Sequence, residues 1–110
     1  MTQSILEIIE SDIKTNDIVL YMKGTRDMPK CGFSASVSAL LVNLEVPFKD
    51  VNVLKSHGMR QGIKEYADWA TIPQLYIKGE FIGGCDIIKE MHQKGELHDL
   101  LEEKGLLRST

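Results

Sequence analysis

Cys31 is the residue of this sequence best placed to do chemistry. It lies between an apolar run, residues 18–22, and a stretch, residues 37–44, whose apolar side chains recur at helical spacing. This pattern predicts a strand, a loop and a helix, with Cys31 at the start of the helix. Unpaired N–H groups and the helix dipole at such a position favour a thiolate. The pattern therefore predicts a reactive cysteine.

Lys23, at the end of the predicted strand, is the cation best placed to assist this cysteine. Its ammonium group can approach Cys31, or an anionic ligand beside it, and favour the charged form of the thiol. A helix end alone contributes about 0.3 to 2 kcal/mol, so an added charge matters. Position alone also allows an inert buried cysteine and a surface lysine, and both interpretations stay open here.

Composition and charge predict one globular domain over residues 1–110. The chain is 43% hydrophobic, which suffices for one core without disulfides. Thirteen basic and 16 acidic side chains give a net charge of -3 without a basic block, so we expect no nucleic-acid partner. No apolar run approaches a membrane span of roughly 20 residues, and the N-terminus has no secretory or transit pattern. We expect no membrane association and a cytoplasmic or already processed protein.

The two cysteines are too few and too dispersed for a disulfide framework or a closed zinc site, which fits a reducing compartment. Cys85 is expected to be a small, half-buried thiol, with a disulfide to Cys31 as the lesser alternative. His57, His92 and His98 share no metal-ligand spacing, so we expect them to be solvated.

The apolar patterns predict a mixed four-stranded sheet flanked by helices, an α/β fold. A Ser4–Glu7 capping box begins a helix that ends near Thr15. The strands 18–22 and 48–53 enclose one helix, which implies a parallel, right-handed crossover. Residues 74–77 and 80–82 flank a short turn and predict an antiparallel hairpin.

Three further helices are expected, beginning after Ser56, at Asp86 and at Glu96. The first of these should carry its apolar residues on one side. They are Met59, Ile63, Tyr66, Ala67 and Ala70.

Four motifs in order make the sequence resemble the monothiol glutaredoxins of the Cys-Gly-Phe-Ser class. They are Lys23-Gly-Thr, Cys31-Gly-Phe-Ser, Trp69 followed by Thr71-Ile-Pro-Gln-Leu-Tyr, and Gly79-Glu-Phe-Ile-Gly-Gly-Cys-Asp. The resemblance spans residues 2–105 and implies a thioredoxin-like fold, glutathione as ligand and a [2Fe-2S] cluster. One departure is Ala70, where close relatives often carry proline.

The resemblance also implies a ligand site. Lys23 and Arg60 would face the glycine carboxylate of glutathione, the backbone of Ile72 would pair with the cysteinyl part, and Cys85 and Asp86 would hold the γ-glutamyl end. N–H groups at a helix start do receive carboxylates, although an ordinary helix cap is the alternative on the residues alone.

Pro73 has two interpretations. It can form a rigid turn before the hairpin, or a cis peptide bond that leaves the Ile72 backbone free to pair with a ligand. The resemblance favours the cis bond. Gly83 and Gly84 end the last strand and also permit close approach of a ligand to the backbone.

Two functional classes compete. One is a carrier that holds a cluster with glutathione, and the other is an oxidoreductase that removes glutathione from mixed disulfides with Cys31 as nucleophile. Ser34 stands where dithiol enzymes have a resolving cysteine, which excludes a two-cysteine cycle. The loop 24–30 is longer than in dithiol relatives, and we expect it to favour the carrier by turning the glutathione thiol outward. A surface adaptor would leave Cys31 unexplained.

Cys31 is also the expected metal ligand. A [2Fe-2S] cluster needs four ligands, usually thiolates, and one chain offers one convincing thiolate. With glutathione supplying the others, as the resemblance implies, we expect a homodimer when the cluster is bound. The expected partners are iron-sulfur acceptor proteins and BolA-like proteins that replace one subunit.

Overall fold

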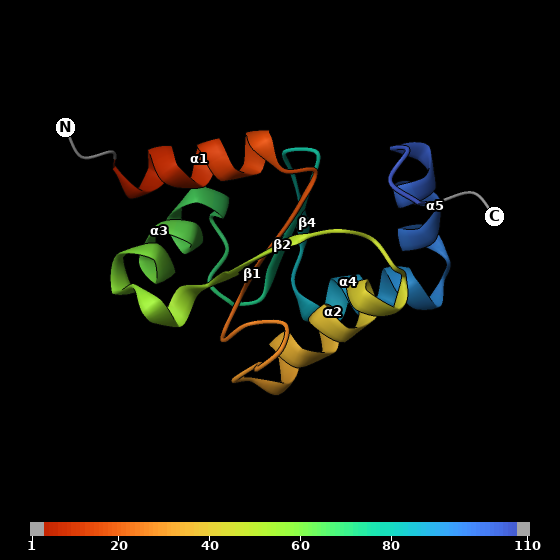
Figure 1. Ribbon diagram of the computed structural model, residues 1–110, viewed down its shortest axis with the longest axis horizontal. Coiled ribbons are helices and arrows are strands. Elements are labelled where there is room, and N and C mark those ends of the chain that lie inside the picture. The colour runs from red at the N-terminus through yellow and green to blue at the C-terminus, as the bar shows by residue number, and fades with distance from the viewer. Residues whose placement is uncertain (1–3, 108–110) are drawn as a thin grey trace.

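The computed structural model describes residues 4–107, which form one sheet with helices on both faces (Figure 1). The elements in chain order are α1 (Ile5–Thr15), β1 (Ile18–Met22), α2 (Gly32–Asn43), β2 (Lys49–Asn52), a 3-10 turn (Val53–Lys55), α3 (His57–Ala67), β3 (Gln74–Ile77), β4 (Glu80–Gly83), α4 (Cys85–Gln93) and α5 (Glu96–Glu103). Residues 1–3 and 108–110 lie outside the described range, so a single domain over residues 1–110 stays a prediction. None of the helices within residues 4–107 is long and apolar enough to cross a membrane.

The sheet has the strand order β2-β1-β3-β4, with β1 in a central position. β1 pairs in parallel with β2 and antiparallel with β3, and β3 and β4 form the antiparallel hairpin. The register places Leu20 opposite Asp50 and Met22 opposite Asn52. The predicted mixed four-stranded sheet and the parallel pairing of its first two strands are thus confirmed.

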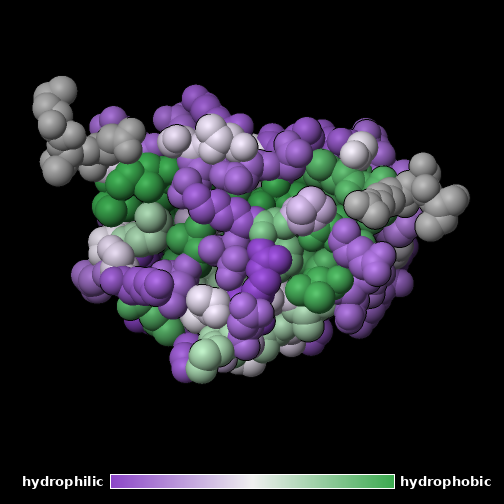
Figure 2. Space-filling view, in the orientation of Figure 1, coloured by the Kyte–Doolittle hydropathy of each residue, from purple (hydrophilic) through white to green (hydrophobic). Residues whose placement is uncertain are grey.

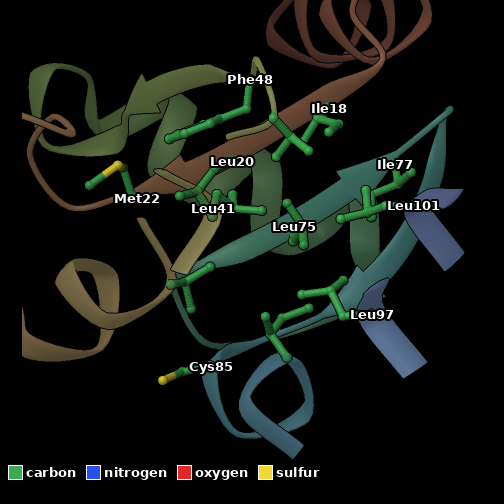
Figure 3. Close-up of a cluster of buried hydrophobic side chains, with 13 residues drawn as sticks. Ile18, Leu20, Met22, Leu41, Phe48, Leu75, Ile77, Cys85, Leu97 and Leu101 are labelled. Atoms are coloured by element: carbon green, nitrogen blue, oxygen red, sulfur yellow. The ribbon is translucent and has the colours of Figure 1, made fainter. Parts of the chain in front are cut away.

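β1 is buried along its whole length because both of its faces are covered. Ile18, Leu20 and Met22 join a core with α2, α4 and α5, which Figure 3 shows in close-up. Val19 and Tyr21 point to the other face and join a core with α1 and α3. The alternation of side chains along one strand therefore creates two cores.

Polar caps begin two of the helices as predicted. The hydroxyl of Ser4 accepts from the N–H of Glu7 at 3.2 Å, and the hydroxyl of Ser56 accepts from the N–H of Met59 at 3.1 Å. Each satisfies an N–H group that has no partner within its own helix.

The predicted apolar side of α3 is partly wrong. The helix ends at Ala67, because Asp68 adopts a left-handed backbone conformation with φ of 51°, so Ala70 lies beyond the helix. Tyr66 is 39% exposed, and its ring lies 6.2 Å from that of the buried Tyr76. Ile63 is fully buried, as expected.

The face of the molecule seen in Figure 2 carries both hydrophobic and hydrophilic residues. Hydrophobic residues show near α1 and α3 and again towards α5, and hydrophilic residues separate them. This face therefore carries separate apolar areas rather than one continuous patch.

Candidate functional site

A pocket of about 700 Å3 lies where the start of α2, α3, the segment before β3 and the start of α4 meet. Its lining is both charged and apolar, and it is open to solvent. The residues that line it are Lys23, Cys31, Phe33, Lys64, Trp69, Ala70, Thr71, Ile72, Pro73, Gly84, Cys85, Asp86 and Ile87. The volume and the mixed lining suit a peptide-sized ligand.

Cys31 is a free, half-exposed thiol at the N-cap of α2. Hydrogen bonding by the Ser34 backbone is the main cause that lowers the pKa of Cys31 below its ordinary value. Partial burial opposes this, while the Phe33 backbone, the Ser34 hydroxyl and the charge of Lys23 lower the pKa further. The site therefore favours a thiolate that can reach solvent and ligand.

Ser34 has a structural role of its own. Its side chain is fully buried, and its hydroxyl accepts from the backbone N–H of Lys23 at 3.0 Å. This bond joins the end of β1 to the first turn of α2, so Lys23 and Cys31 are held at the same corner of the pocket. The residue that replaces a resolving cysteine is also a link between two elements of the site.

The segment before β3, residues 69–73, forms another wall of the pocket, and we call it the proline loop. The peptide bond between Ile72 and Pro73 is cis, as predicted. Gln74, which follows directly, is fully buried. Its amide nitrogen donates to the carbonyl of Trp69 at 3.0 Å and to that of Thr71 at 3.3 Å.

The oxygen of the same Gln74 amide accepts from the hydroxyl of Tyr76 at 3.2 Å. Every polar atom of the Gln74 side chain thus has a partner, as a buried amide requires. The Gln74 side chain therefore holds two carbonyls of the proline loop from inside the protein.

The start of α4 forms a third wall. The helix begins at Cys85, one residue earlier than predicted, with Gly84 at its N-cap. The first N–H groups of α4 have no partner within the helix, so they are available to an anionic group in the pocket. The thiol of Cys85 is buried and free, and burial is the main cause that raises its pKa. Cys85 is thus unsuited to act as a second thiolate.

The cations of the pocket differ from those that the sequence indicated. Lys23 lines the pocket as expected, but among the described residues Arg60 is not one of the lining side chains. Lys64, one helical turn further along α3, lines it instead. The spacing of four residues puts Lys64 on the same face of α3 as Arg60, but the sequence does not say which turn of that face lies beside the pocket.

Potential metal ligands are sparse. Within residues 4–107 no three His, Cys, Asp or Glu side chains lie together in a way that could hold a metal ion. His57, His92 and His98 are all exposed. In this part of the chain Cys31 therefore does not belong to a cluster of three such side chains.

Fold and site together define a thioredoxin-like protein with one accessible thiol at a ligand-sized pocket. The glutaredoxin family model matches residues 18–82. A probable monothiol glutaredoxin of Rickettsia typhi is 51% identical over 93% of this chain and 92% of its own length. The mitochondrial monothiol glutaredoxin-5 of Saccharomyces cerevisiae is 50% identical over 97% of this chain and 73% of its own length.

Solved structures are also similar to this chain. Trypanosoma brucei 1-C-Grx1, as a monomeric truncated mutant, has a TM-score of 0.88 and 34% identity, with complete coverage of both chains. Reduced poplar apo GrxS14 has a TM-score of 0.78 and 47% identity over 88% of this chain and 89% of its own. The chain belongs to the glutaredoxin family, as a monothiol member of the Cys-Gly-Phe-Ser class.

Proposed function

We propose that this monothiol glutaredoxin binds glutathione in its pocket and carries a [2Fe-2S] cluster, held by Cys31, to iron-sulfur acceptor proteins. The observation that carries the proposal is the single accessible thiol with a lowered pKa beside a pocket with lysines and a helix N-terminus. No second thiol stands at position 34 to turn this site into a dithiol centre.

Glutathione fits the groups that the pocket presents. It has two carboxylates, an ammonium group and a peptide backbone, so it needs cations, a helix start and backbone partners. Lys23 and Lys64 suit the glycine carboxylate, while the N–H groups at Cys85 and the carboxylate of Asp86 suit the γ-glutamyl end. The Ile72 backbone suits the cysteinyl part. Arg60 stays a predicted contact.

A buckwheat glutaredoxin solved as a glutathione complex has a TM-score of 0.82 with this chain, covers 94% of it and shares 23% identity. At this identity the likeness concerns the fold alone. Glutathione is therefore proposed here from the pocket of this chain.

The donor set fits a shared cluster better than a cluster on one chain. Four ligands are needed, and Cys31 is the thiol that is accessible and has a lowered pKa, whereas Cys85 is buried with a raised pKa. Two Cys31 thiolates from two chains and two glutathione thiolates complete the count. The cluster-loaded form is thus proposed to be a glutathione-dependent homodimer.

The proposal also covers the protein partners and the location in the cell. A cluster shared between two small surfaces is easily handed on, which suits transfer to acceptor proteins and replacement of one subunit by a BolA-like protein. Two free thiols fit a reducing compartment, so we assign the protein to the cytoplasm.

The lowered pKa of Cys31 also favours a second candidate, removal of glutathione from mixed disulfides. The Cys31 thiolate would attack the glutathione sulfur, form a disulfide with it and release the substrate thiolate. A second glutathione thiolate would then release oxidised glutathione and restore Cys31. This cycle needs no second protein cysteine.

Anaerobic reconstitution with iron, a sulfide source and glutathione tests the proposal. Visible absorption, iron and sulfide content and mass in solution should report a coloured dimer with glutathione and a colourless, mainly monomeric protein without it. Cys31→Ser should abolish the colour, and Cys85→Ser, which keeps the backbone, should largely preserve it.

Three outcomes would contradict the proposal. A stable cluster on a glutathione-free monomer refutes the shared site. Loss of colour in a folded Cys85→Ser variant would make Cys85 a ligand. Fast glutathione-dependent disulfide turnover by a protein that takes up no cluster favours the second candidate.

A further inference from the structure

The seven residues 24–30, which we call the pre-helix loop, form a small closed unit. Gly24 and Pro29 make an isolated antiparallel bridge, and Thr25 and Met28 exchange backbone hydrogen bonds at 3.2 Å. At the neck of the loop, the N–H of Lys30 donates to the carbonyl of Lys23 at 2.9 Å. Because these bonds close the loop on itself, it is expected to move as one body.

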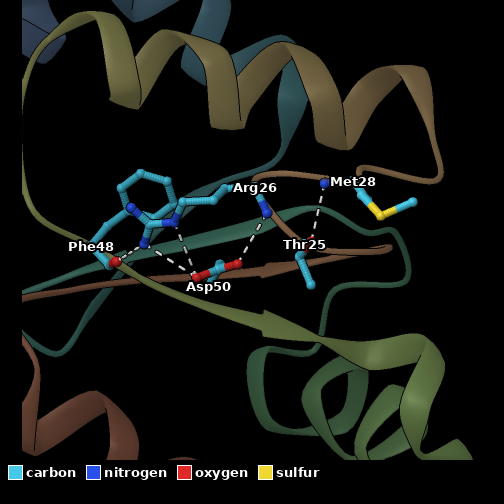
Figure 4. Close-up of polar contacts among 5 residues, drawn as sticks. All are labelled: Thr25, Arg26, Met28, Phe48 and Asp50. Atoms are coloured by element: carbon cyan, nitrogen blue, oxygen red, sulfur yellow. Dashed lines mark hydrogen bonds and ion pairs between the residues drawn. The ribbon is translucent and has the colours of Figure 1, made fainter.

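Arg26 fastens this loop to the edge strand β2 (Figure 4). Its backbone N–H donates to one carboxylate oxygen of Asp50 at 3.0 Å, and its Nε and Nη2 both lie 3.2 Å from the other oxygen. Nη2 also donates to the carbonyl of Phe48, and the guanidinium lies 3.8 Å from the centre of the Phe48 ring. One side chain thus makes an ion pair, a backbone bond and a cation–π contact.

Asn52 makes a smaller contact of the same kind. Its side-chain oxygen accepts from the N–H of Gly24 at 2.9 Å. Asp50 and Asn52 are two residues apart on β2, so both side chains lie on one side of the strand. Alternate N–H groups of the loop, at Gly24 and Arg26, are therefore bonded to alternate side chains of β2.

The two ends of the loop are functional residues. Lys23 precedes it, Cys31 follows it, and both line the pocket. The N–H of Lys23 is bonded to the Ser34 hydroxyl, and Ser34 lies in the first turn of the helix that begins directly after Cys31. If the loop moved, the hydrogen-bonded residues Lys23 and Lys30 at its ends would move with it and change the position of Cys31.

We propose that Arg26 is a positioning residue for Cys31. It holds the pre-helix loop on β2 and so fixes how Lys23 and Cys31 face the pocket, without touching the ligand. The inference rests on the proposed function only in taking Cys31 as the working thiol.

A simpler alternative is that the charge of Arg26 acts directly on the thiol through space. The two explanations predict opposite effects on the Cys31 thiolate when the charge of Asp50 is removed. Loss of the Asp50 charge alone would favour the thiolate if the direct field decided, whereas release of the loop disfavours it. They also differ for Arg26→Lys, which keeps the charge but not the planar geometry that contacts Asp50 and Phe48 together.

The test is the rate of alkylation of Cys31 by iodoacetamide across a pH series, with the modified peptide measured by mass spectrometry. Near neutral pH we expect Arg26→Ala, Arg26→Lys and Asp50→Ala each to react about two- to five-fold more slowly. The double variant Arg26→Ala/Asp50→Ala should be no slower than either single variant, because both break one interaction. Hydrogen exchange at residues 24–30 should be faster in all of them.

Lys49→Ala is the matched control. It removes a positive charge from the same strand and breaks an ion pair to Asp12 of 2.9 Å that does not involve the loop. Its thiol should react as in the unchanged protein. Wild-type reactivity of Arg26→Lys, faster reaction of Asp50→Ala, or equal slowing by Lys49→Ala would each overturn the inference.

Alkylation of the apo-protein requires neither glutathione nor a cluster. Unchanged alkylation rates would overturn the role of Arg26 and leave the proposed function standing. A protein that takes up no cluster, yet whose thiol depends on Arg26 and Asp50 as described, would overturn the proposed function alone.

Discussion

One loop connects two residues that line the pocket, Lys23 and Cys31, and another loop lines the pocket directly. The two loops are held by different kinds of interaction. The pre-helix loop is held from outside by Arg26 and Asp50, whose side chains are 34% and 22% exposed. The proline loop is held from inside by Gln74, which is fully buried and has all its polar atoms paired. The two anchors therefore serve different purposes, local geometry in the pre-helix loop and global stability in the proline loop.

A buried amide cannot exchange its partners for water, so breaking it costs the full desolvation of the groups left unpaired. A partly exposed ion pair can exchange its partner for water, and such pairs contribute about 0 to 1 kcal/mol to global stability. Arg26 is therefore suited to set local geometry at Cys31, whereas Gln74 is part of what keeps the protein folded.

The surroundings of the proline loop strengthen this contrast. The ring of Trp69 lies 5.5 Å from that of Phe81, which lies 5.4 Å from that of Tyr76. Tyr76 is 1% exposed and belongs to the core with α1 and α3. An unbroken series of aromatic contacts thus connects the proline loop with this core, whereas the pre-helix loop reaches the other core through the contact of Arg26 with the Phe48 ring.

The largest effect is expected from Gln74→Glu. The isosteric carboxyl group cannot donate to both the Trp69 and Thr71 carbonyls, so the unfolding free energy should fall by about 2 to 5 kcal/mol. Denaturant unfolding measures it, with the surface substitution Lys78→Ala as control. Destabilisation by Arg26→Ala as large as that by Gln74→Glu would break the comparison between the loops.

An intermediate effect is expected from the two lysines that line the pocket. Lys23→Ala and Lys64→Ala should each weaken glutathione binding by about 1 to 3 kcal/mol, or less if the contacts prove to be exposed. The resemblance predicts the same loss for Arg60→Ala, whereas the pocket lining predicts a smaller one. Calorimetric titration of the three variants decides between these expectations.

If Lys23→Ala and Lys64→Ala both bound glutathione as tightly as the unchanged protein, neither lysine would belong to the binding site. A loss confined to Arg60→Ala would restore the assignment made from the sequence. Circular dichroism of the three variants guards against unfolding as the cause.

The smallest effect concerns acid pH. Partial burial alone raises the pKa of Asp50, but hydrogen bonds from the Arg26 backbone and side chain and the guanidinium charge leave it below its ordinary value. The stabilisation of the loop by Asp50 is therefore complete above roughly pH 4 and is lost as the pH falls through the lowered pKa. The cost in global stability should stay below about 1 kcal/mol.

An NMR titration of the Arg26 amide, which donates to Asp50, measures this step. Its chemical shift should move only at acid pH, and Asp50→Asn should remove the movement. A transition of the same amide near neutral pH would show that another group controls the loop.

The sequence by itself determined the secondary structure around the site. The five apolar residues of β1, the serine caps at Ser4 and Ser56 and the position of Cys31 before α2 all follow from local chemistry and short-range periodicity. The residues around Pro73 left a rigid turn and a cis bond open, and the family resemblance favoured the cis bond that the structure contains. These features involve residues only a few positions apart.

The tertiary structure alone decided which distant residues meet. Arg26 and Asp50 are 24 positions apart, and their pairing depends on the parallel register of β1 and β2 rather than on any local pattern. Arg60 and Lys64 lie one turn apart on the same face of α3, and the placement of the helix in the fold brings the turn of Lys64, rather than that of Arg60, beside the pocket. Spacing along a helix predicts which residues share a face, but only the tertiary packing determines which turn of that face meets the pocket.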